Sequence, residues 1–365
     1  MEKFDALLVG FYGMSNTGDD MLMAAAAAGA RQKFKAERIA VTAAKDSEAP
    51  LRLGLINTQS RQQRFKGQDR LLKYWAAKRS KHIIIGGGSV LHTTKDIHQK
   101  RQYLSLAQST QHIAAGVGIG PFVDGKAEQA CAQFLNTCSF TGLRDRDSYD
   151  IARSIAPNAN VALTFDLAPG LRYEPEFVAS LAEQRQPAIG IALCPVERFA
   201  GREDLELARL KSIATGLRKF CADQPHEIRL IDFNGHTQLG DNQVHQQLKA
   251  MLGDLPCKII DYQANPYTAI HEISELSGIV AMRLHAAIFA YLSDTPCIAL
   301  NYHPKCHNWC RDIGQASEFA SDSGQIDSEW LYQRLLDISG NNYISPTLDV
   351  AEACRKAQLN WNHPL

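Results

Sequence analysis

The sequence predicts an α/β protein of two domains, each built around a parallel sheet. Short apolar runs that end in Gly, Pro or Asn alternate along the chain with longer stretches of helix-forming residues. This alternation is typical of parallel strands whose sheet is covered by helices on both faces. The length of 365 residues exceeds the size at which a single hydrophobic core stops growing, which indicates two domains.

The strands are expected where the apolar runs lie. The first run, FDALLVG, is followed by a loop rich in Gly, Asn and Asp and then by DMLMAAAAAGARQKF, which contains strong helix formers. The same strand-to-helix unit recurs along the chain. The expected strands are residues 4–10, 81–88, 111–120, 187–195, 226–235, 277–286 and 295–302.

A polar, proline-containing stretch at residues 171–187 is interpreted as the domain junction. We therefore predict an N-terminal α/β domain over residues 1–175, a C-terminal α/β domain over residues 176–345 and a C-terminal helical tail over residues 346–365. The two domains are expected to face each other across a cleft. Ligands of such sheets bind outside the carboxyl ends of the strands.

The composition argues against several classes of protein. Lys plus Arg and Asp plus Glu both number 39, so no overall charge attracts nucleic acid or an anionic membrane. The nine cysteines have irregular spacing, which favours reduced thiols in a cytoplasmic protein over a secreted disulfide framework. No apolar run reaches the roughly 18 residues of a membrane span, so we expect no integral membrane segment.

The loop after the first strand, GFYGMSNTGDD, has the glycines of a phosphate-binding loop. Asp19 and Asp20 stand where the helix begins, and two carboxylates there would repel a phosphate. They could instead cap the free N–H groups of the helix or accept hydrogen bonds from sugar hydroxyls. We predict acceptor-binding or loop-shaping roles for Asn16, Asp19 and Asp20.

Three consecutive glycines, Gly86, Gly87 and Gly88, end the expected strand of residues 81–88. They remove every side chain from the carboxyl edge of the sheet, so something must approach closely there. We expect an acceptor ligand, with packing of a helix as the alternative. The run GVGIGP at residues 116–121 is a weak match to a dinucleotide-binding fingerprint, because it has proline where the helix should open.

Arg283 and His285 interrupt a stretch that is otherwise apolar or small. GIVAM before them is typical of a strand and AAIFAYL after them of a helix, so the pair is expected at a strand-to-helix junction. A buried charge needs a partner, so either the neighbourhood or a ligand must supply an anion. Lys305 follows the next expected strand and would place a second cation at the neighbouring edge.

A third candidate stretch is GLRDRDSYDIA at residues 142–152. It places Arg144 at the end of a short apolar run, before a helix that Asp147 or Ser148 could cap. Most such charge runs neutralise themselves at the surface, and that alternative stays open for this one. Arg144 could also point inward at a strand end.

Four possible metal ligands cluster at residues 303–310, where two histidines and two cysteines occur. Zinc sites usually combine two such clusters at short internal spacings, and no second cluster is evident. We therefore expect no metal and assign surface or packing roles to His303, Cys306, His307 and Cys310.

Taken in order, these motifs resemble the polysaccharide pyruvyl transferase family. The segments that carry the resemblance are GFYGMSNTGDDML, IIIGGGSVLH, GVGIGPF, GLRDRDS, FDLAPGL and MRLHAAIFAYLSDTPCIALNYHPK. The resemblance extends from residue 10 to about residue 314, and its specific parts are the RLH run, the following lysine and the RD-x-D-S run. It implies two Rossmann-like domains in a GT-B-like fold, and transfer of pyruvate from phosphoenolpyruvate to a sugar as a cyclic ketal.

The resemblance also implies roles for individual residues. Arg144, Arg283 and Lys305 match the family's donor-binding residues, and His285 matches its histidine. Phosphoenolpyruvate carries a carboxylate and a phosphate, so cations suit its site, and we choose His285 as the acid that protonates the methylene carbon. Asp20, where glutamate is commoner, and the MSNT run depart from the family pattern, which leaves the acceptor sugar open.

The resemblance also implies which partners to expect. They are phosphoenolpyruvate and a saccharide of a cell-surface or exopolysaccharide, with no nucleic acid and no further cofactor. If the acceptor is lipid-linked, the cytoplasmic protein would associate peripherally with the inner membrane face. Two alternatives stay open: a nucleotide-sugar-dependent GT-B glycosyltransferase, and a non-catalytic sugar-binding protein.

Overall fold

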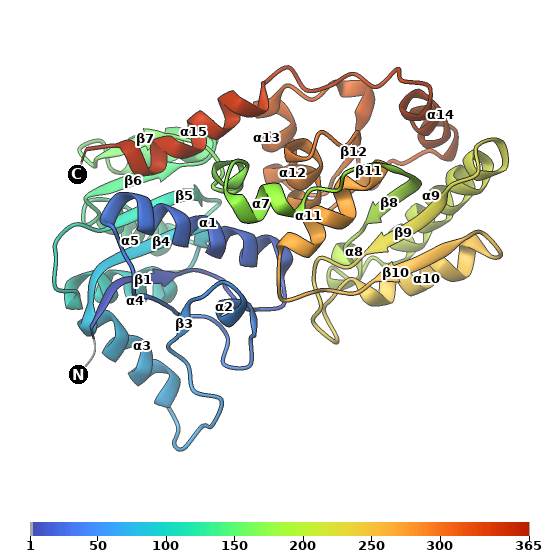
Figure 1. The fold of residues 1–365 in the computed structure, drawn as a ribbon. Coiled ribbons are helices and arrows are strands. Elements are labelled where there is room, and N and C mark those ends of the chain that lie inside the picture. Colours follow the sequence, from blue (N-terminus) through green and yellow to red (C-terminus); the bar gives the residue numbers. More distant parts are fainter. Residues whose placement is uncertain (1–2, 365) are drawn as a thin grey trace. The chain divides into compact units, whose positions relative to one another are not determined.

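The computed structural model describes residues 3–364, which form two compact units (Figure 1). Of the described residues, 3–14, 19–172 and 351–364 belong to unit 1, whereas unit 2 contains Ser15–Gly18 and Tyr173–Val350. Each unit is built around one parallel sheet with helices on both faces. The structure thus confirms the predicted α/β class.

Unit 1 has a seven-stranded sheet in the order β3-β2-β1-β4-β5-β6-β7, with every neighbouring pair parallel. Its strands are β1 (Phe4–Val9), β2 (Ile39–Val41), β3 (Ile56–Asn57), β4 (Ser80–Leu91), β5 (Ile113–Ile119), β6 (Phe140–Leu143) and β7 (Val161–Leu163). Apart from Asp5, Lys81 and Ser89, all residues of the central strands β1, β4 and β5 are buried, which explains their apolar composition.

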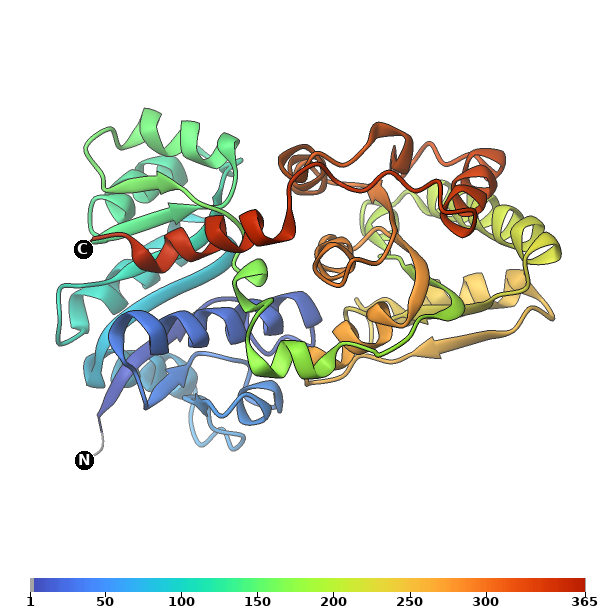
Figure 2. The ribbon, with the colours of Figure 1, turned by 45° about the horizontal axis from the view of Figure 1, so that its top comes forward.

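The helices of unit 1 cover the two faces of this sheet. They are α1 (Thr17–Phe34), whose first two residues belong to unit 2, α2 (Ala49–Arg52), α3 (Gln68–Arg79), α4 (Thr94–Leu106), α5 (Gly125–Leu135), α6 (Arg146–Ile155), the 3-10 helix η1 (Ala168–Leu171) and α15 (Val350–Asn362), whose first residue belongs to unit 2. Helices α3 to α6 pack in succession, and α15 lies beside α1 (Figure 2). A β-carbon at Gly29 of α1 would lie 2.0 Å from the Trp361 ring, so the absent side chain makes room for α15.

Unit 2 has a six-stranded parallel sheet in the order β10-β9-β8-β11-β12-β13. Its strands are β8 (Gln186–Ala192), β9 (Glu227–Ile231), β10 (Cys257–Ile260), β11 (Leu276–Ala281), β12 (Cys297–Asn301) and β13 (Ala320–Asp322). Its helices are α7 (Pro175–Ser180), α8 (Val196–Phe199), α9 (Glu203–Asp223), α10 (Asn242–Leu252), α11 (Tyr267–Ser274), α12 (Leu284–Leu292), α13 (Pro304–Ile313), the 3-10 helix η2 (Ser317–Phe319) and α14 (Ser328–Ser339).

The strand at the three glycines is longer than predicted. β4 continues through Gly86, Gly87 and Gly88 to Leu91, and its register against β5 shifts after Gly88. Gly87 and Gly88 have φ values of 66° and 78°, which favour glycine because it lacks a β-carbon. The glycines therefore form an irregular stretch within the strand and do not end it.

Candidate active site at the carboxyl edge of the second sheet

The RLH run lies at a strand-to-helix junction, as predicted. β11 ends at Ala281 and α12 begins at Leu284. The connection is tied to the neighbouring strand, because the N–H groups of Met282 and Arg283 both donate to the carbonyl of Ala192, at 2.9 and 3.2 Å. The backbone at Arg283 is thereby fixed at the carboxyl edge of the sheet, where α/β proteins bind ligands.

Arg283 is held by the buried carboxylate of Asp241. Its Nε lies 3.1 Å from each carboxylate oxygen, and its Nη2 donates to Oδ1. Asp241 has no exposed surface and lies 42 residues earlier in the chain. The protein therefore supplies an anion for Arg283, and this side chain needs no bound ligand to be accommodated.

Asp241 is itself fixed by the backbone. Its Oδ2 accepts the N–H groups of Phe233 and Asn234, at 3.0 and 2.9 Å, just beyond the end of β9. Burial alone would lower the pKa of Arg283, but the Asp241 carboxylate reverses the direction and raises it, so the guanidinium is charged. Asp241 engages Nε and Nη2 of Arg283, and Nη1 takes no part in this pair.

His285 is the second residue of α12, and Gly18 packs against its ring. A β-carbon added at Gly18 would lie 2.2 Å from Nδ1 and 2.5 Å from Cγ of His285, far inside van der Waals contact. The Phe289 ring meets the imidazole edge-on at a centroid distance of 6.3 Å. The imidazole therefore has a residue without a side chain and an aromatic ring as neighbours.

The segment that carries Gly18 is bound to the end of β9. The N–H of Thr17 donates to the carbonyl of Phe233 at 2.8 Å, and the N–H of Gly235 donates to the carbonyl of Ser15 at 2.8 Å. Asn16 forms an antiparallel bridge between these two bonds, and its Oδ1 accepts the N–H of Gly18 at 3.1 Å. Residues 233–235 thus support both the counter-ion of Arg283 and the glycine that contacts His285.

Lys305 lies at the neighbouring strand, in the first turn of α13. The His303 side chain caps this helix by accepting the N–H of Lys305 at 3.3 Å, and Lys305 Nζ lies 5.7 Å from the centre of the Tyr302 ring. Burial raises the pKa of Tyr302, while the charge of Arg283 opposes this shift, which places Tyr302 within electrostatic reach of Arg283. Because β11 and β12 are adjacent, Arg283, His285 and Lys305 share one sheet edge.

A buried histidine also supports this edge. His245 of α10 accepts the N–H of Leu193 at Nε2, at 3.1 Å, so its proton is on Nδ1 and is donated to Asp232 at 2.5 Å. Asp232 also accepts a hydrogen bond from the Asn242 side chain at 2.9 Å. This chain of bonds ties the ends of β8 and β9 to the start of α10, which carries Asp241 at its N-terminus.

Arg144 belongs to unit 1 and follows β6 directly. Its Nη2 donates to Ser89 Oγ at 2.8 Å, and its Nε lies 3.4 Å from Asp145 Oδ2. A β-carbon at Gly118 would lie 2.8 Å from Nη2, so the glycine allows the guanidinium to lie over β5. Arg144 thus points inward, and its role at the donor site of the other unit stays a prediction.

The predicted cap of the following helix is wrong. Asp145, and not Asp147 or Ser148, caps α6, because its Oδ1 accepts the N–H of Ser148 at 2.8 Å. The helix begins one residue after this cap, at Arg146. In the pair of Arg144 and Asp145, the arginine therefore points inward and the aspartate caps α6.

The acidic residues of the first loop differ in their surroundings. Asp20 has no exposed surface, and its Oδ1 accepts the N–H of Gly13 at 3.0 Å, so it shapes the loop. Asp19 lies beside the strand glycines, where a β-carbon at Gly88 would be 3.9 Å from its Oδ1. Burial, followed by the charge of Asp19, raises the pKa of Tyr12 above its ordinary value.

At two of the strand glycines the close neighbour is protein. The Tyr12 hydroxyl donates to the carbonyl of Gly86 at 2.5 Å, and a β-carbon at Gly86 would lie 2.7 Å from Ala26 of α1. A β-carbon at Gly87 would lie 2.9 Å from Leu22 of the same helix. The expectation of a ligand against these two glycines is therefore corrected in favour of helix packing.

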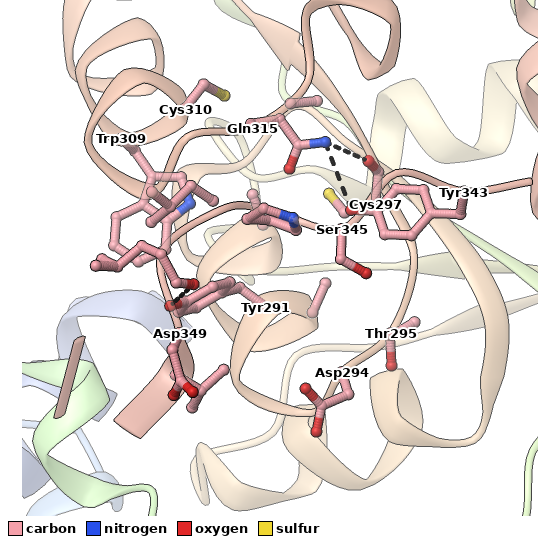
Figure 3. Close-up of a pocket in the computed structure, with 17 residues that line it drawn as sticks. Tyr291, Asp294, Thr295, Cys297, Trp309, Cys310, Gln315, Tyr343, Ser345 and Asp349 are labelled. Carbon is pink, nitrogen blue, oxygen red and sulfur yellow. Dashed lines mark hydrogen bonds between the residues drawn. The ribbon is translucent and has the colours of Figure 1, made fainter. Parts of the chain in front are cut away.

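A separate cavity of about 300 Å³ lies between α12, α13 and residues 343–350 of unit 2 (Figure 3). It is lined by aromatic rings such as Tyr343 and by the carboxylates of Asp294 and Asp349. Among the described residues, no Lys, Arg or His lines it. The cavity is therefore poorly suited to an anionic donor, and it contains none of the predicted site residues.

The residues considered as metal ligands are arranged along α13. Cys306 and Cys310 are buried and His307 is exposed, whereas His303 caps the helix. Within residues 3–364, no group of three or more His, Cys, Asp or Glu side chains could hold a metal ion. The same part of the chain contains no helix with the length and apolar character needed to cross a bilayer.

Solved structures of sugar-processing enzymes share the fold. The UDP-GlcNAc 2-epimerase from Methanocaldococcus jannaschii has a TM-score of 0.60 and 12% identity, covering 97% of this chain and 98% of that chain. The UDP-GlcNAc 2-epimerase from Neisseria meningitidis bound to UDP-GlcNAc has a TM-score of 0.60 and 11% identity over the same shares. A glycosyltransferase from Rickettsia africae ESF-5 has a TM-score of 0.54 and 8% identity, covering 99% and 95%. The fold is therefore GT-B-like, as predicted.

The sequence comparison defines the family. The sequence profile of the polysaccharide pyruvyl transferases matches residues 16–304, which is most of the chain. The chain belongs to the polysaccharide pyruvyl transferase family, and the resemblance seen in the motifs is confirmed. Among curated proteins, no sequence is significantly similar to it.

Proposed function

We propose that the protein transfers pyruvate from phosphoenolpyruvate to a saccharide as a cyclic ketal, in the synthesis of a cell-surface or exopolysaccharide. Membership of the polysaccharide pyruvyl transferase family supports a transferase with a saccharide acceptor. The observation that carries the proposal is the Arg283–Asp241 pair, which fixes a charged guanidinium two residues before His285 at the carboxyl edge. Lys305 follows the adjacent strand.

The charges at this edge favour an anionic donor. Asp241 compensates one positive charge, that of Arg283, and holds the guanidinium in one orientation. Lys305 adds a cation in the first turn of α13. In our proposal Arg283 and Arg144 bind the carboxylate and the phosphate of phosphoenolpyruvate, and Lys305 stabilises the departing phosphate.

The reaction requires a proton at the methylene carbon. His285 gives this proton, the double bond becomes a methyl group, and the positive charge that develops at the central carbon is stabilised as an oxocarbenium-like centre. A sugar hydroxyl attacks that carbon and loses its proton, and the C–O bond to phosphate breaks. A second hydroxyl of the same sugar then bonds to the carbon and closes the ring. Of the two hydroxyl protons, one restores His285 and the other leaves with phosphate.

None of these steps calls for a resident cofactor, so we propose phosphoenolpyruvate as the sole small-molecule donor. The acceptor supplies two neighbouring hydroxyls, and a lipid-linked acceptor would bring the cytoplasmic protein to the inner membrane face. No step involves nucleic acid.

The test is incubation of the purified protein with phosphoenolpyruvate and a panel of saccharides, with phosphate release and proton NMR as readouts. We expect phosphate release that depends on a saccharide, and a new methyl signal on the product. An enolpyruvyl ether would have the same mass as the ketal but no methyl group, so the NMR signal separates the two reactions. Transfer from a UDP-sugar without use of phosphoenolpyruvate would instead identify a glycosyltransferase.

A further inference from the structure

Unit 1 contains a cavity of about 190 Å³ at the carboxyl ends of β1 and β2. It is lined by residues that follow these strands, including Gly10 and Thr42, and by residues of α3 and α4. Sites that enclose a drug-sized ligand usually measure roughly 300 to 1,000 Å³, so this cavity suits one monosaccharide-sized unit. Its position is that of a ligand site in a parallel α/β sheet.

One residue that lines the cavity, Tyr103, has a buried hydroxyl that lacks a partner. Tyr103 of α4 is only 2% exposed, and its hydroxyl makes no hydrogen bond with the residues that the structure describes. Burial, followed by the nearby Tyr74 and Asp96, raises the pKa of Tyr103 above its ordinary value, so the phenol is neutral and can donate. A buried polar group without a partner is costly, and a bound ligand would remove that cost.

Two lysines give the cavity a net positive charge. Lys100 of α4 is 5% exposed and its Nζ lies 2.6 Å from Asp96, which also lines the cavity. Lys73 of α3 lines the cavity as well, and no ion pair of this half-buried side chain is seen among the described residues. Among the residues that line the cavity, two ammonium groups against one carboxylate leave one positive charge for an anion.

An apolar rim adjoins these charges. Phe11 and Met14 line the cavity with side chains that are 49% and 56% exposed. The ammonium of Lys100 lies 6.0 Å from the centre of the Phe11 ring. Exposed aromatic rings can pack on the C–H face of a sugar, which a small inorganic anion would not require.

We infer that this cavity is an acceptor subsite for a sugar unit that carries an anionic substituent. Lys73 and Lys100 bind the anionic group, the Tyr103 hydroxyl donates a hydrogen bond, and Phe11 packs against the sugar ring. The inference rests on the proposed function, which includes a saccharide acceptor. It goes further by assigning a negative charge to that acceptor. A phosphate and a carboxylate are two sources of the same charge.

The test measures binding of glucose 1-phosphate, glucuronic acid and glucose by calorimetry, without phosphoenolpyruvate. We expect at least one anionic probe to bind at least about tenfold more tightly than glucose. Tyr103→Phe should weaken that binding about three- to tenfold and leave stability unchanged or raised, because it deletes only a hydroxyl without a partner. Lys73→Ala should weaken binding of the anionic probes and leave binding of glucose unchanged.

Two matched variants serve as controls. Tyr74→Phe removes a hydroxyl from the ring that packs edge-on against Tyr103 but does not line the cavity. Lys78→Ala removes an exposed lysine from the same helix as Lys73. Both should bind the probes as the unaltered protein does. Equal binding of all three probes, binding of none, or insensitivity to Tyr103→Phe and Lys73→Ala would overturn the inference.

The experiments distinguish a failure of this inference from a failure of the proposed function. The binding readout needs no phosphoenolpyruvate, so failure of pyruvyl transfer would leave probe binding as measured. Conversely, if the probes do not bind but phosphate release from phosphoenolpyruvate is seen with a neutral saccharide, the proposed function stands and the anionic subsite does not.

Discussion

Gly18 lies against the imidazole of His285 so closely that a β-carbon at position 18 would be 2.2 Å from Nδ1. The glycine is carried by a segment that pairs with residues 233–235, and the same residues bind Asp241. The orientation of His285 and the anchoring of Arg283 therefore depend on one short stretch of backbone.

Gly18→Ala should displace the imidazole and slow turnover by about tenfold or more, because misplacing a catalytic group by about 1 Å can cost a hundredfold. We expect the affinity for phosphoenolpyruvate to change little, so the loss should appear in kcat. The control is Gly125→Ala, also at the start of a helix, where a β-carbon would meet nothing within 4 Å. Equal activity of the two variants would remove Gly18 as a positioning residue.

Asp241→Asn should destabilise the protein by about 3 to 5 kcal/mol, since it leaves the guanidinium of Arg283 without its buried carboxylate. Urea unfolding at pH 7 measures this loss. Glu352→Gln is the control, because it breaks an ion pair with Arg355 whose side chains are 67% and 40% exposed, and such pairs contribute at most about 1 kcal/mol. A loss for Asp241→Asn no larger than that of the control would show that Arg283 has another partner.

The sequence predicted the existence of the long strands well, and it predicted that the RLH run lies where a strand gives way to a helix. The runs at residues 81–88, 187–195 and 277–286 are apolar enough to reveal β4, β8 and β11, although β8 ends at Ala192 and β11 at Ala281, before the predicted ends. Strands β2, β3 and β7 have only two or three residues each, too few for any periodicity. These short strands form because neighbouring strands supply hydrogen-bond partners for their backbone groups. The local sequence does not reveal such partners.

The contacts within the site could not be predicted in the same way. Asp241 meets Arg283 across 42 residues, and nothing near Asp241 marks it as a counter-ion. A glycine in a strand can make room for a ligand or for a packed helix, and the local sequence does not distinguish the two. At Gly86 and Gly87 it makes room for α1. A signal for Gly18 did exist, because an early glycine in a helix costs stability and so indicates a close neighbour.

Arg144→Ala should weaken binding of phosphoenolpyruvate, by about 2 to 5 kcal/mol if the charge contact is desolvated. Arg146→Ala is the matched control, since this arginine lies two residues away with a side chain that is 60% exposed. Calorimetric titration with phosphoenolpyruvate measures both. Unchanged affinity for Arg144→Ala would assign this arginine to the structure of unit 1.

His112 should make stability depend on pH. Burial, followed by the nearby His82, lowers the pKa of His112 from 6.5 to about 4, and its Nδ1 accepts the N–H of Ile83 at 3.2 Å. Between these two values only the unfolded chain takes up the proton, so the free energy of unfolding should fall as the pH drops from about 6.5 to about 4. The loss should be about 3 kcal/mol.

Urea unfolding across that pH range, with His112→Asn for comparison, measures this effect. The asparagine side chain keeps an acceptor for Ile83 but does not titrate. The variant should therefore lose less stability than the unaltered protein as the pH falls. Parallel pH dependences of the two proteins would contradict the assignment.

The central claim is that His285 protonates the methylene carbon of phosphoenolpyruvate during ketal formation. The most direct measurement is the reaction in D₂O, with NMR of the ketal methyl group for the unaltered protein and for His285→Gln. For the unaltered protein we predict one deuterium in each methyl group and one phosphate released for each ketal formed. For His285→Gln we predict turnover that is at least about a hundredfold slower, with binding of phosphoenolpyruvate retained. A pyruvylated product without deuterium in a methyl group, or near-normal turnover of His285→Gln, would contradict the claim.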